Sequence, residues 1–271
     1  MSDWIANARM YAVTPGVEAG WRGLLEHVAR DAGVALDYTP YPAPQPLEPL
    51  WLRPDLGAVF MCGFPIALGL APVVPIAAPI PAAGWAAGRA VYRTNLIVRQ
   101  DAPYRTLEDS FGSRAGYTVK HSQSGFNAFR QLLLSFRTPG RPRLYLEMVG
   151  NLVTARNVLE SVLTGRIDIG PLDAYWQLLL EHSAPELTAG IRVLATTKLT
   201  PIPAFVAAAS ATAEMVAALR SAFVNAALRP WFAAYRELLQ LDGFAAVDRA
   251  TYLPLLDWDR EARAAGYELP A

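Results

Sequence analysis

One polar run of this 271-residue chain combines residue types that could bind an anion, His121-Ser122-Gln123-Ser124-Gly125. It lies between an expected strand and an expected helix. Two hydroxyls and a glycine at a helix start direct side-chain donors and free backbone N–H groups toward one point, where the helix dipole favours negative charge. The run therefore predicts a site for a phosphate-like group. The alternative is that one serine caps the helix while the other is solvated.

Two aspartates occupy a second segment of interest, around the expected strand Ile167–Gly170. Asp168 fits a structural role in the turn. Asp173 follows the strand, at the edge where open α/β sheets bind ligands. An acid there could accept a hydrogen bond from a ligand hydroxyl or amine, or it could cap the next helix, and the sequence leaves both readings open.

Catalytic and metal-binding motifs are missing from the sequence. His121 is too close in sequence to Ser122 and Ser124 to form a catalytic triad with them. The glycine fingerprints of nucleotide-binding loops do not occur. The histidines are far apart, and the single cysteine, Cys62, stands in an apolar run that predicts a buried structural thiol. We predict no catalytic residue, no metal site and no cofactor.

The charge balance limits the possible partners. Twenty-four basic residues offset 24 acidic ones, so no broad electrostatic field attracts nucleic acid. The longest apolar stretch, residues 67–83, is interrupted by prolines, and no run of about 20 apolar residues could span a membrane. The first residues lack the pattern of a secretory leader. The protein is expected to be cytoplasmic, or periplasmic if a leader has been removed.

Strand-length apolar runs alternate with segments of helical period, which predicts an α/β fold. A first strand is expected at Arg9–Val13, followed by a helix from Val17 to Ala32 that ends at Gly33. Gly57–Cys62 is predicted to be a buried strand. From Ala213 onward the pattern indicates a mostly helical chain.

Several segments, in order, resemble the phosphate/phosphonate-type substrate-binding proteins of ABC importers. The landmarks are residues 92–103, Ser122 to Phe126, Val158 to Asp173, residues 200–203, and the late Gly243-Phe244, Tyr252 and Gly266-Tyr267. The resemblance implies an α/β, two-lobed type II periplasmic-binding-protein fold with a ligand cleft between the lobes. It also implies lobe one at 1–93 plus 200–271, lobe two at 94–199, and a hinge near 92–99 and 196–204.

The resemblance also implies site residues. In the family the serine-rich helix start grips the phosphonate oxygens, and this role falls on Ser122, Gln123, Ser124 and Gly125. Tyr92 and Arg93, on the first hinge strand, would flank the ligand. A further candidate is Asp173, after the Asp168-Ile169-Gly170 strand of the second lobe. Apart from the resemblance, Tyr41 lies near an expected strand end and could line a cleft, or it could be an ordinary packing residue.

Arg156 departs from the family pattern. Relatives that bind aminoalkyl phosphonates carry a His-Glu pair at the corresponding helix start, and Arg156 stands in place of the acid. An arginine repels an ammonium group, so the expected ligand has no amine: phosphate, phosphite, a simple phosphonate, a sulfonate or a carboxylate. The alternative is that Arg156 is a solvated helix-surface residue.

The resemblance implies a function in ligand binding without chemistry. The chain is expected to close its lobes around a small anionic ligand as the binding component of an ABC importer, with a permease as partner and as a monomer. One alternative is a cytoplasmic or tethered sensor of the same fold. Enzymes that make the thiamine pyrimidine precursor share the fold, but their cysteine-rich iron motif is absent here.

Overall fold

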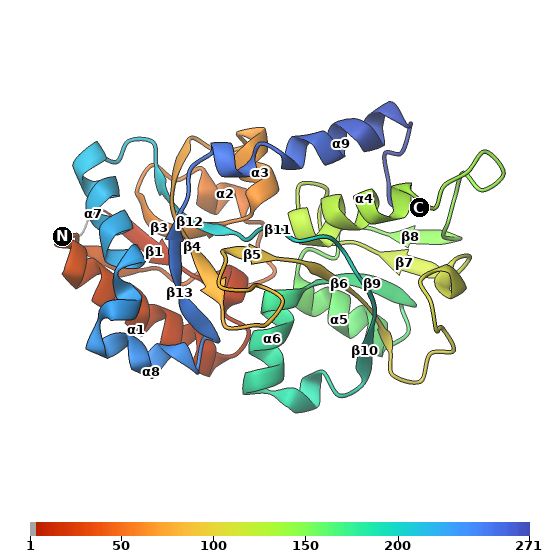
Figure 1. The fold of residues 1–271 in the computed structure, drawn as a ribbon, viewed down its shortest axis with the longest axis horizontal. Helices are drawn as coiled ribbons and strands as arrows, with labels where there is room; N and C mark the ends of the chain where they lie inside the picture. Colours follow the sequence, from red (N-terminus) through yellow and green to blue (C-terminus); the bar gives the residue numbers. More distant parts are fainter. Residues whose placement is uncertain (1–3) are drawn as a thin grey trace. The chain divides into compact units, whose positions relative to one another are not determined.

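The computed structural model describes residues 4–271. Residues 1–3 lie outside the described part. They include the start of the predicted first lobe and of the N-terminal sequence that lacks a leader pattern. The chain folds into two compact α/β units, which agrees with the predicted fold class (Figure 1). Unit 1 contains the residues up to Tyr92 together with Pro201–Leu253, and unit 2 contains Arg93–Thr200 together with Pro254–Ala271.

The chain passes between the two units three times, after Tyr92, Thr200 and Leu253. Short strands, β5 (Val91–Tyr92) and β11 (Thr200–Pro201), lie at the first two crossings. The sequence-based boundaries assign all of 200–271 to one lobe, whereas the structure returns Pro254–Ala271 to unit 2.

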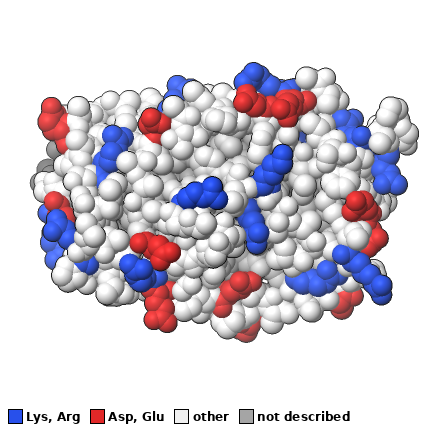
Figure 2. Space-filling model, in the orientation of Figure 1, with Lys and Arg blue, Asp and Glu red and all other residues white. Residues whose placement is uncertain are grey.

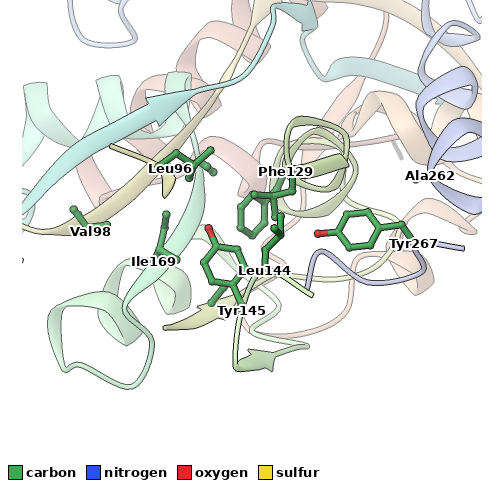
Figure 3. Packing of buried hydrophobic residues seen from close by; sticks show 11 residues of the cluster. Leu96, Val98, Phe129, Leu144, Tyr145, Ile169, Ala262 and Tyr267 are labelled. Atoms are coloured by element: carbon green, nitrogen blue, oxygen red, sulfur yellow. The ribbon is translucent and has the colours of Figure 1, made fainter. Parts of the chain in front are cut away.

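The return of the C-terminal segment is explained by burial of its apolar side chains. Helix α9 (Leu255–Ala264) places Ala262 in the core of unit 2, and Tyr267 follows it there. Figure 3 shows both residues beside the aromatic and aliphatic side chains of that core. Further members of the cluster are Leu96, Val98, Leu107, Ala115, Phe129, Leu133, Leu144, Tyr145 and Ile169. Burial of this apolar surface favours docking of the segment on unit 2.

Unit 1 is built on a mixed sheet whose strands follow the order β13-β4-β12-β3-β1-β2 within the described residues. The strands are β1 (Trp4–Asn7), β2 (Leu36–Tyr38), β3 (Leu56–Met61), β4 (Val73–Pro81), β12 (Ala204–Ala208) and β13 (Leu241–Ala246). The helices are α1 (Pro15–Ala32), α2 (Glu48–Trp51), α3 (Gly63–Leu68), α7 (Ala213–Val224) and α8 (Ala233–Arg236). Strands β1, β2 and β3 are parallel, so their carboxyl ends share one edge.

Helix α1 forms where the sequence predicted it. The Thr14 hydroxyl accepts a hydrogen bond from the Val17 N–H at 3.3 Å and caps the helix start. Gly33 ends the helix with a φ of 66°, a left-handed conformation that favours glycine. Both signals are local in sequence, which is why the helix could be predicted.

One expectation for unit 1 was wrong. The first strand is β1, and Arg9–Tyr11 forms a 3₁₀ turn where a strand was expected. The turn forms because the Asn7 side-chain oxygen accepts the Arg9 N–H at 2.9 Å, which bends the chain away from the sheet. The region after Ala213 is mostly helical, as predicted, and it also contains strand β13, which pairs with β4 along the sheet edge.

Aromatic rings fill the core of unit 1. Phe60 stacks on Phe205 with ring centroids 3.8 Å apart, and Phe205 stacks on Phe223 at 4.8 Å. Trp21 meets Phe60 edge to face at 5.2 Å. These contacts tie α1 and α7 to the centre of the sheet, because the rings come from both helices and from two adjacent strands.

Unit 2 contains the second mixed sheet, with the strand order β10-β6-β9-β7-β8 in the described residues. The strands are β6 (Thr94–Arg99), β7 (Arg114–Gly116), β8 (Glu147–Val149), β9 (Ile169–Asp173) and β10 (Ile191–Thr196). Besides α9, its helices are α4 (Ala128–Leu134), α5 (Ala155–Leu163) and α6 (Ala174–Ser183). Helix α9 packs against α4, which follows the polar run identified in the sequence (Figure 1).

Surface charge and hydropathy agree with the composition. Figure 2 shows acidic and basic side chains in small scattered groups over the viewed face, separated by wide uncharged areas. Among residues 4–271, no helix has both the length and the apolar character that crossing a membrane requires. Cys62 is buried, as predicted.

Candidate functional site

The polar run of the sequence forms a tight turn at the start of α4. Ser122 is its cap residue, and the Ser122 Oγ accepts a hydrogen bond from the Gly125 N–H at 3.0 Å. Residues Gln123–Asn127 then wind as a π-turn, in which the Asn127 N–H donates to the Ser122 carbonyl at 3.0 Å. Such π-turns occur often at functional sites, and the free N–H groups of a helix start attract anions.

The two serines of this turn have different surroundings. Ser122 uses its hydroxyl to cap the turn. The Ser124 hydroxyl forms no hydrogen bond within the part of the chain that the structure describes, although the residue is only 9% exposed. The Ser124 carbonyl accepts from the Thr94 hydroxyl at 3.0 Å, which fixes its backbone. Ser124 therefore has a donor to offer a ligand, whereas Ser122 has a structural task.

Gly125 is required by close packing. A Cβ atom at this position would collide with the Thr118 hydroxyl and would lie 2.8 Å from Thr118 Cγ2. The Gly125 carbonyl also accepts from the Thr118 N–H at 3.2 Å. The Thr118 hydroxyl is buried without a partner among the described residues. The turn thus lies directly against the segment that follows β7.

Gln123 faces the interior of unit 2. Its side chain is fully buried, and Gln123 Oε1 accepts a hydrogen bond from Asn127 Nδ2 at 2.9 Å. This contact closes the turn across one winding of helix. The ligand role of Gln123 stays a prediction.

Asp173 lies close to the same turn. It pairs with Thr94 across strands β6 and β9, so both side chains project from one face of the sheet. One Asp173 carboxylate oxygen accepts from the N–H groups of Tyr175 and Trp176 at 2.9 and 3.0 Å, which caps α6. The capping reading is therefore confirmed, and a ligand role stays a prediction because a carboxylate has capacity for more bonds.

Arg156 is half-buried on the first turn of α5. Its guanidinium carbon lies 5.8 Å from the centre of the Trp176 ring, within the range of a cation–π contact. Trp176 belongs to the first turn of α6, the helix that Asp173 caps. Arg156 and Asp173 therefore border the same helix start and place opposite charges there.

The remaining predicted site residues lie at the first crossing and in unit 1. The Arg93 carbonyl, in unit 2, accepts from the Ala174 N–H at 3.0 Å, beside Asp173. Tyr92, in unit 1, is buried with its hydroxyl 3.9 Å from Cys62 Sγ. Tyr41, also in unit 1, donates its hydroxyl hydrogen to the Pro46 carbonyl at 2.7 Å.

Asp168 confirms the structural reading. It accepts from the Arg114 backbone N–H at 2.9 Å and pairs with the Arg114 guanidinium at 3.0 Å. Burial alone would raise the pKa of Asp168, but the hydrogen bonds from Arg114 outweigh it and lower the pKa. The residue joins the start of β7 to the turn before β9.

Three polar residues near the candidate positions were missed from the sequence. Thr94 and Thr118 contact the serine turn but carry no motif, and only the strand register of Thr94 could have pointed to it. Arg9, at the carboxyl edge of β1, lies over the Tyr41 ring at 5.5 Å. Burial lowers the pKa of the Arg9 guanidinium more than the neighbouring Tyr41 and Glu48 raise it. The sequence did not indicate Arg9 as a site residue because it fell within the strand expected at Arg9–Val13.

Metal binding finds no support in the described residues, where no group of three or more potential ligands is close enough to hold an ion. The serine turn instead offers hydrogen-bond donors and a helix start, and Arg156 supplies a guanidinium beside the start of α6 in the same unit. These groups suit a small oxyanion.

Solved structures of several binding proteins resemble the chain. A binding protein component of an ABC phosphonate transporter from Pseudomonas aeruginosa is 16% identical, with 97% of this chain and 88% of that chain covered and a TM-score of 0.77. PhnD1 from Prochlorococcus marinus, in complex with methylphosphonate, is 13% identical over 96% and 98%, with a TM-score of 0.76. A protein from Xanthomonas citri bound to ATP is 17% identical over 97% and 98%, with a TM-score of 0.63. These likenesses confirm the two-lobed type II fold.

The family follows from the sequence match. No curated protein matches the chain. The family model for the periplasmic substrate-binding protein of phosphonate ABC transporters matches residues 14–252. Its members are binding proteins and not enzymes, which agrees with the missing catalytic motifs. The chain therefore belongs to the family of phosphonate-type periplasmic substrate-binding proteins of ABC transporters.

Proposed function

We propose that this protein binds a small oxyanion without an amine at the serine turn of unit 2. The observation that carries the proposal is the Ser124 hydroxyl, which forms no hydrogen bond among the described residues although Ser124 is only 9% exposed. The hydroxyl oxygen is not one of the buried atoms that lack a partner, so it is open to water or to a ligand. An oxyanion at this helix start would receive that hydrogen bond together with those of backbone N–H groups.

Charge supports the choice of ligand class. Arg156, on the first turn of α5, adds positive potential near the start of α6 and disfavours a ligand ammonium group. Asp173 would repel a fully ionised dianion, but it could accept a hydrogen bond from a singly protonated phosphate or phosphonate oxygen. The pair therefore favours a ligand that carries both an ionised oxygen and an O–H group. Phosphate, phosphite and methylphosphonate meet this requirement near neutral pH.

Family membership supports the wider role. We propose that the protein delivers this ligand to an ABC permease and that its two lobes close over the ligand, as in hinge-bending binding proteins. The relative in complex with methylphosphonate supports a phosphonate as one candidate. Tyr92, Arg93 and Tyr41 are proposed as further ligand contacts.

Calorimetric titration with a panel of anions tests the proposal. Phosphate, phosphite, methylphosphonate, an aminoalkyl phosphonate, sulfate and acetate are compared in the same buffer. The amine-free phosphorus oxyanions should bind, and at 100 times the dissociation constant a ligand should stabilise the fold by about 2.7 kcal/mol. If none of these anions binds or shifts the unfolding temperature, the oxyanion proposal is wrong. Preferential binding of the aminoalkyl phosphonate would contradict the role given to Arg156.

A further inference from the structure

The serine turn is bonded to the C-terminal segment of the chain as well as to its own sheet. Asn127, the last residue of the π-turn, is completely buried. Its Nδ2 donates to Gln123 Oε1 at 2.9 Å and to the Leu255 carbonyl, at the start of α9, at 3.1 Å. The Asn127 amide thus joins Gln123, the first residue of the turn, to Leu255, which lies 128 positions beyond Asn127.

A buried ion pair forms a second link. Arg130, in α4, is 1% exposed, and its guanidinium pairs with the Asp259 carboxylate of α9. The same guanidinium nitrogen donates to Asn127 Oδ1 at 3.3 Å. Arg263 completes the link, because its Nε donates to Asp259 Oδ2 at 2.7 Å. Arg130 therefore connects Asp259 with the amide that closes the turn.

We propose that the segment Pro254–Ala271 is a positioning element that holds the Gln123–Asn127 turn in its anion-binding shape. Asn127, Arg130 and Asp259 are the positioning residues, and none of them needs to touch the ligand. The proposal rests on the oxyanion site at Ser124. It assigns a task to the third crossing of the chain, which brings α9 back to unit 2 after unit 1 is complete.

The arrangement of polar contacts distinguishes positioning from simple docking. Ala262 and Tyr267 already attach the segment to the core of unit 2 by apolar burial (Figure 3). A buried ion pair adds little stability compared with apolar residues of similar volume, but it demands a specific geometry. The two buried polar links of the segment converge on Asn127, whose position sets the end of the turn. Its exposed polar links, from Gln131 to Glu261 and from Arg137 to the Ala265 carbonyl, do not reach the turn.

The experiment compares two Asp→Asn substitutions on the same helix. Asp259→Asn removes the carboxylate that pairs with buried Arg130, whereas Asp257→Asn removes one that pairs with exposed Arg260. Each variant loses one negative charge, and this change alone would strengthen anion binding. Weaker binding by Asp259→Asn therefore cannot arise from charge. Affinity for phosphate and methylphosphonate is measured by calorimetry, well below the unfolding temperature of each full-length variant.

We expect Asp259→Asn to raise the dissociation constant about tenfold, the lower end of what losing an outer hydrogen-bonding partner costs at metal sites. Asp257→Asn should match the wild type within about twofold, as for an exposed pair. Arg130→Lys covers the case in which Asp259→Asn does not fold. It keeps the charge, but its shorter side chain does not place an ammonium where the Arg130 guanidinium nitrogen reaches both Asp259 and Asn127, so it should also bind several-fold more weakly.

The outcomes separate the two proposals. If the wild type binds neither anion, the oxyanion site is wrong and the positioning role is overturned with it. If the wild type binds and the folded Asp259→Asn and Arg130→Lys variants bind equally well, only the positioning role is overturned. A fall in unfolding temperature at unchanged affinity would show that the segment stabilises unit 2 and does nothing for the turn.

Discussion

Single replacements of Ser124 and Ser122 by alanine should distinguish a residue that binds the ligand from one that stabilises the turn. Ser124→Ala removes a hydroxyl that forms no hydrogen bond in the described structure, and Ser122→Ala removes the hydroxyl that caps Gly125. The two changes are chemically identical and lie two residues apart. They should nevertheless affect different measurements.

The magnitudes follow from the contacts. A hydrogen bond to a charged group contributes about 1.5–3 kcal/mol, so Ser124→Ala should raise the dissociation constant for phosphate or methylphosphonate by about 10- to 100-fold. Its free energy of unfolding without ligand should change by less than about 0.5 kcal/mol, as for substitutions that break no contact. Ser122→Ala should lower the free energy of unfolding by about 1 kcal/mol through loss of the cap.

The assay combines calorimetry with urea denaturation in the absence of ligand. Ser122→Ala acts as the matched control, because it removes the same group from the same turn. The reasoning would be refuted if the Ser124→Ala variant bound phosphate with wild-type affinity but unfolded at a lower urea concentration than the wild type. Ser124 would then have the structural role that is assigned to Ser122.

Three further predictions concern neighbouring residues. Gly125→Ala should abolish measurable anion binding, because its Cβ would collide with Thr118, and calorimetry that finds wild-type affinity would refute this packing argument. Arg156→Glu should weaken binding of phosphate and improve binding of an aminoalkyl phosphonate in competition titrations, and unchanged selectivity would show that Arg156 is a solvated surface residue. The lowered pKa of Asp168 means that its pairing with Arg114 stabilises the fold above the unfolded-state pKa, about 4, and that this contribution is lost as pH falls through the folded-state pKa. Asp168→Asn should therefore reduce stability at pH 7 and lessen its decline under acid conditions in urea titrations, whereas parallel pH profiles for variant and wild type would contradict the assignment.

Much of the fold could be predicted because its signals are local. The cap at Thr14 and the left-handed Gly33 define α1 from residues within one helix. The first strand was misassigned for a physical reason: Met10, Tyr11 and Val13 are apolar enough for a strand, but the Asn7 side chain accepts the Arg9 N–H and turns the chain. A single side-chain hydrogen bond of this kind does not alter hydrophobic periodicity, which is the signal that predicts strands.

The candidate site likewise has some features that the sequence could predict and others that it could not. The Ser122 cap and Gly125 were visible as a local pattern at a helix start. Thr94, by contrast, reaches Ser124 from a strand 30 residues earlier, and Leu255 reaches Asn127 from 128 residues later. Such contacts depend on tertiary packing, and one sequence does not reveal which distant polar residues will meet. The relation between the serine turn and the C-terminal helix therefore had to come from the structure.

The order of the strands in unit 1 has a consequence for how the chain folds. Strand β12 lies between β3 and β4, where Ala204 is the register partner of Met61 and Phe205 that of Ala77. The whole of Arg93–Thr200 separates these partners in sequence. Pairing over such a distance requires closure of a long loop, which slows folding. During synthesis β3 and β4 lack their shared partner strand until β12 has left the ribosome. Unit 1 should therefore complete its sheet after unit 2, although it begins the chain.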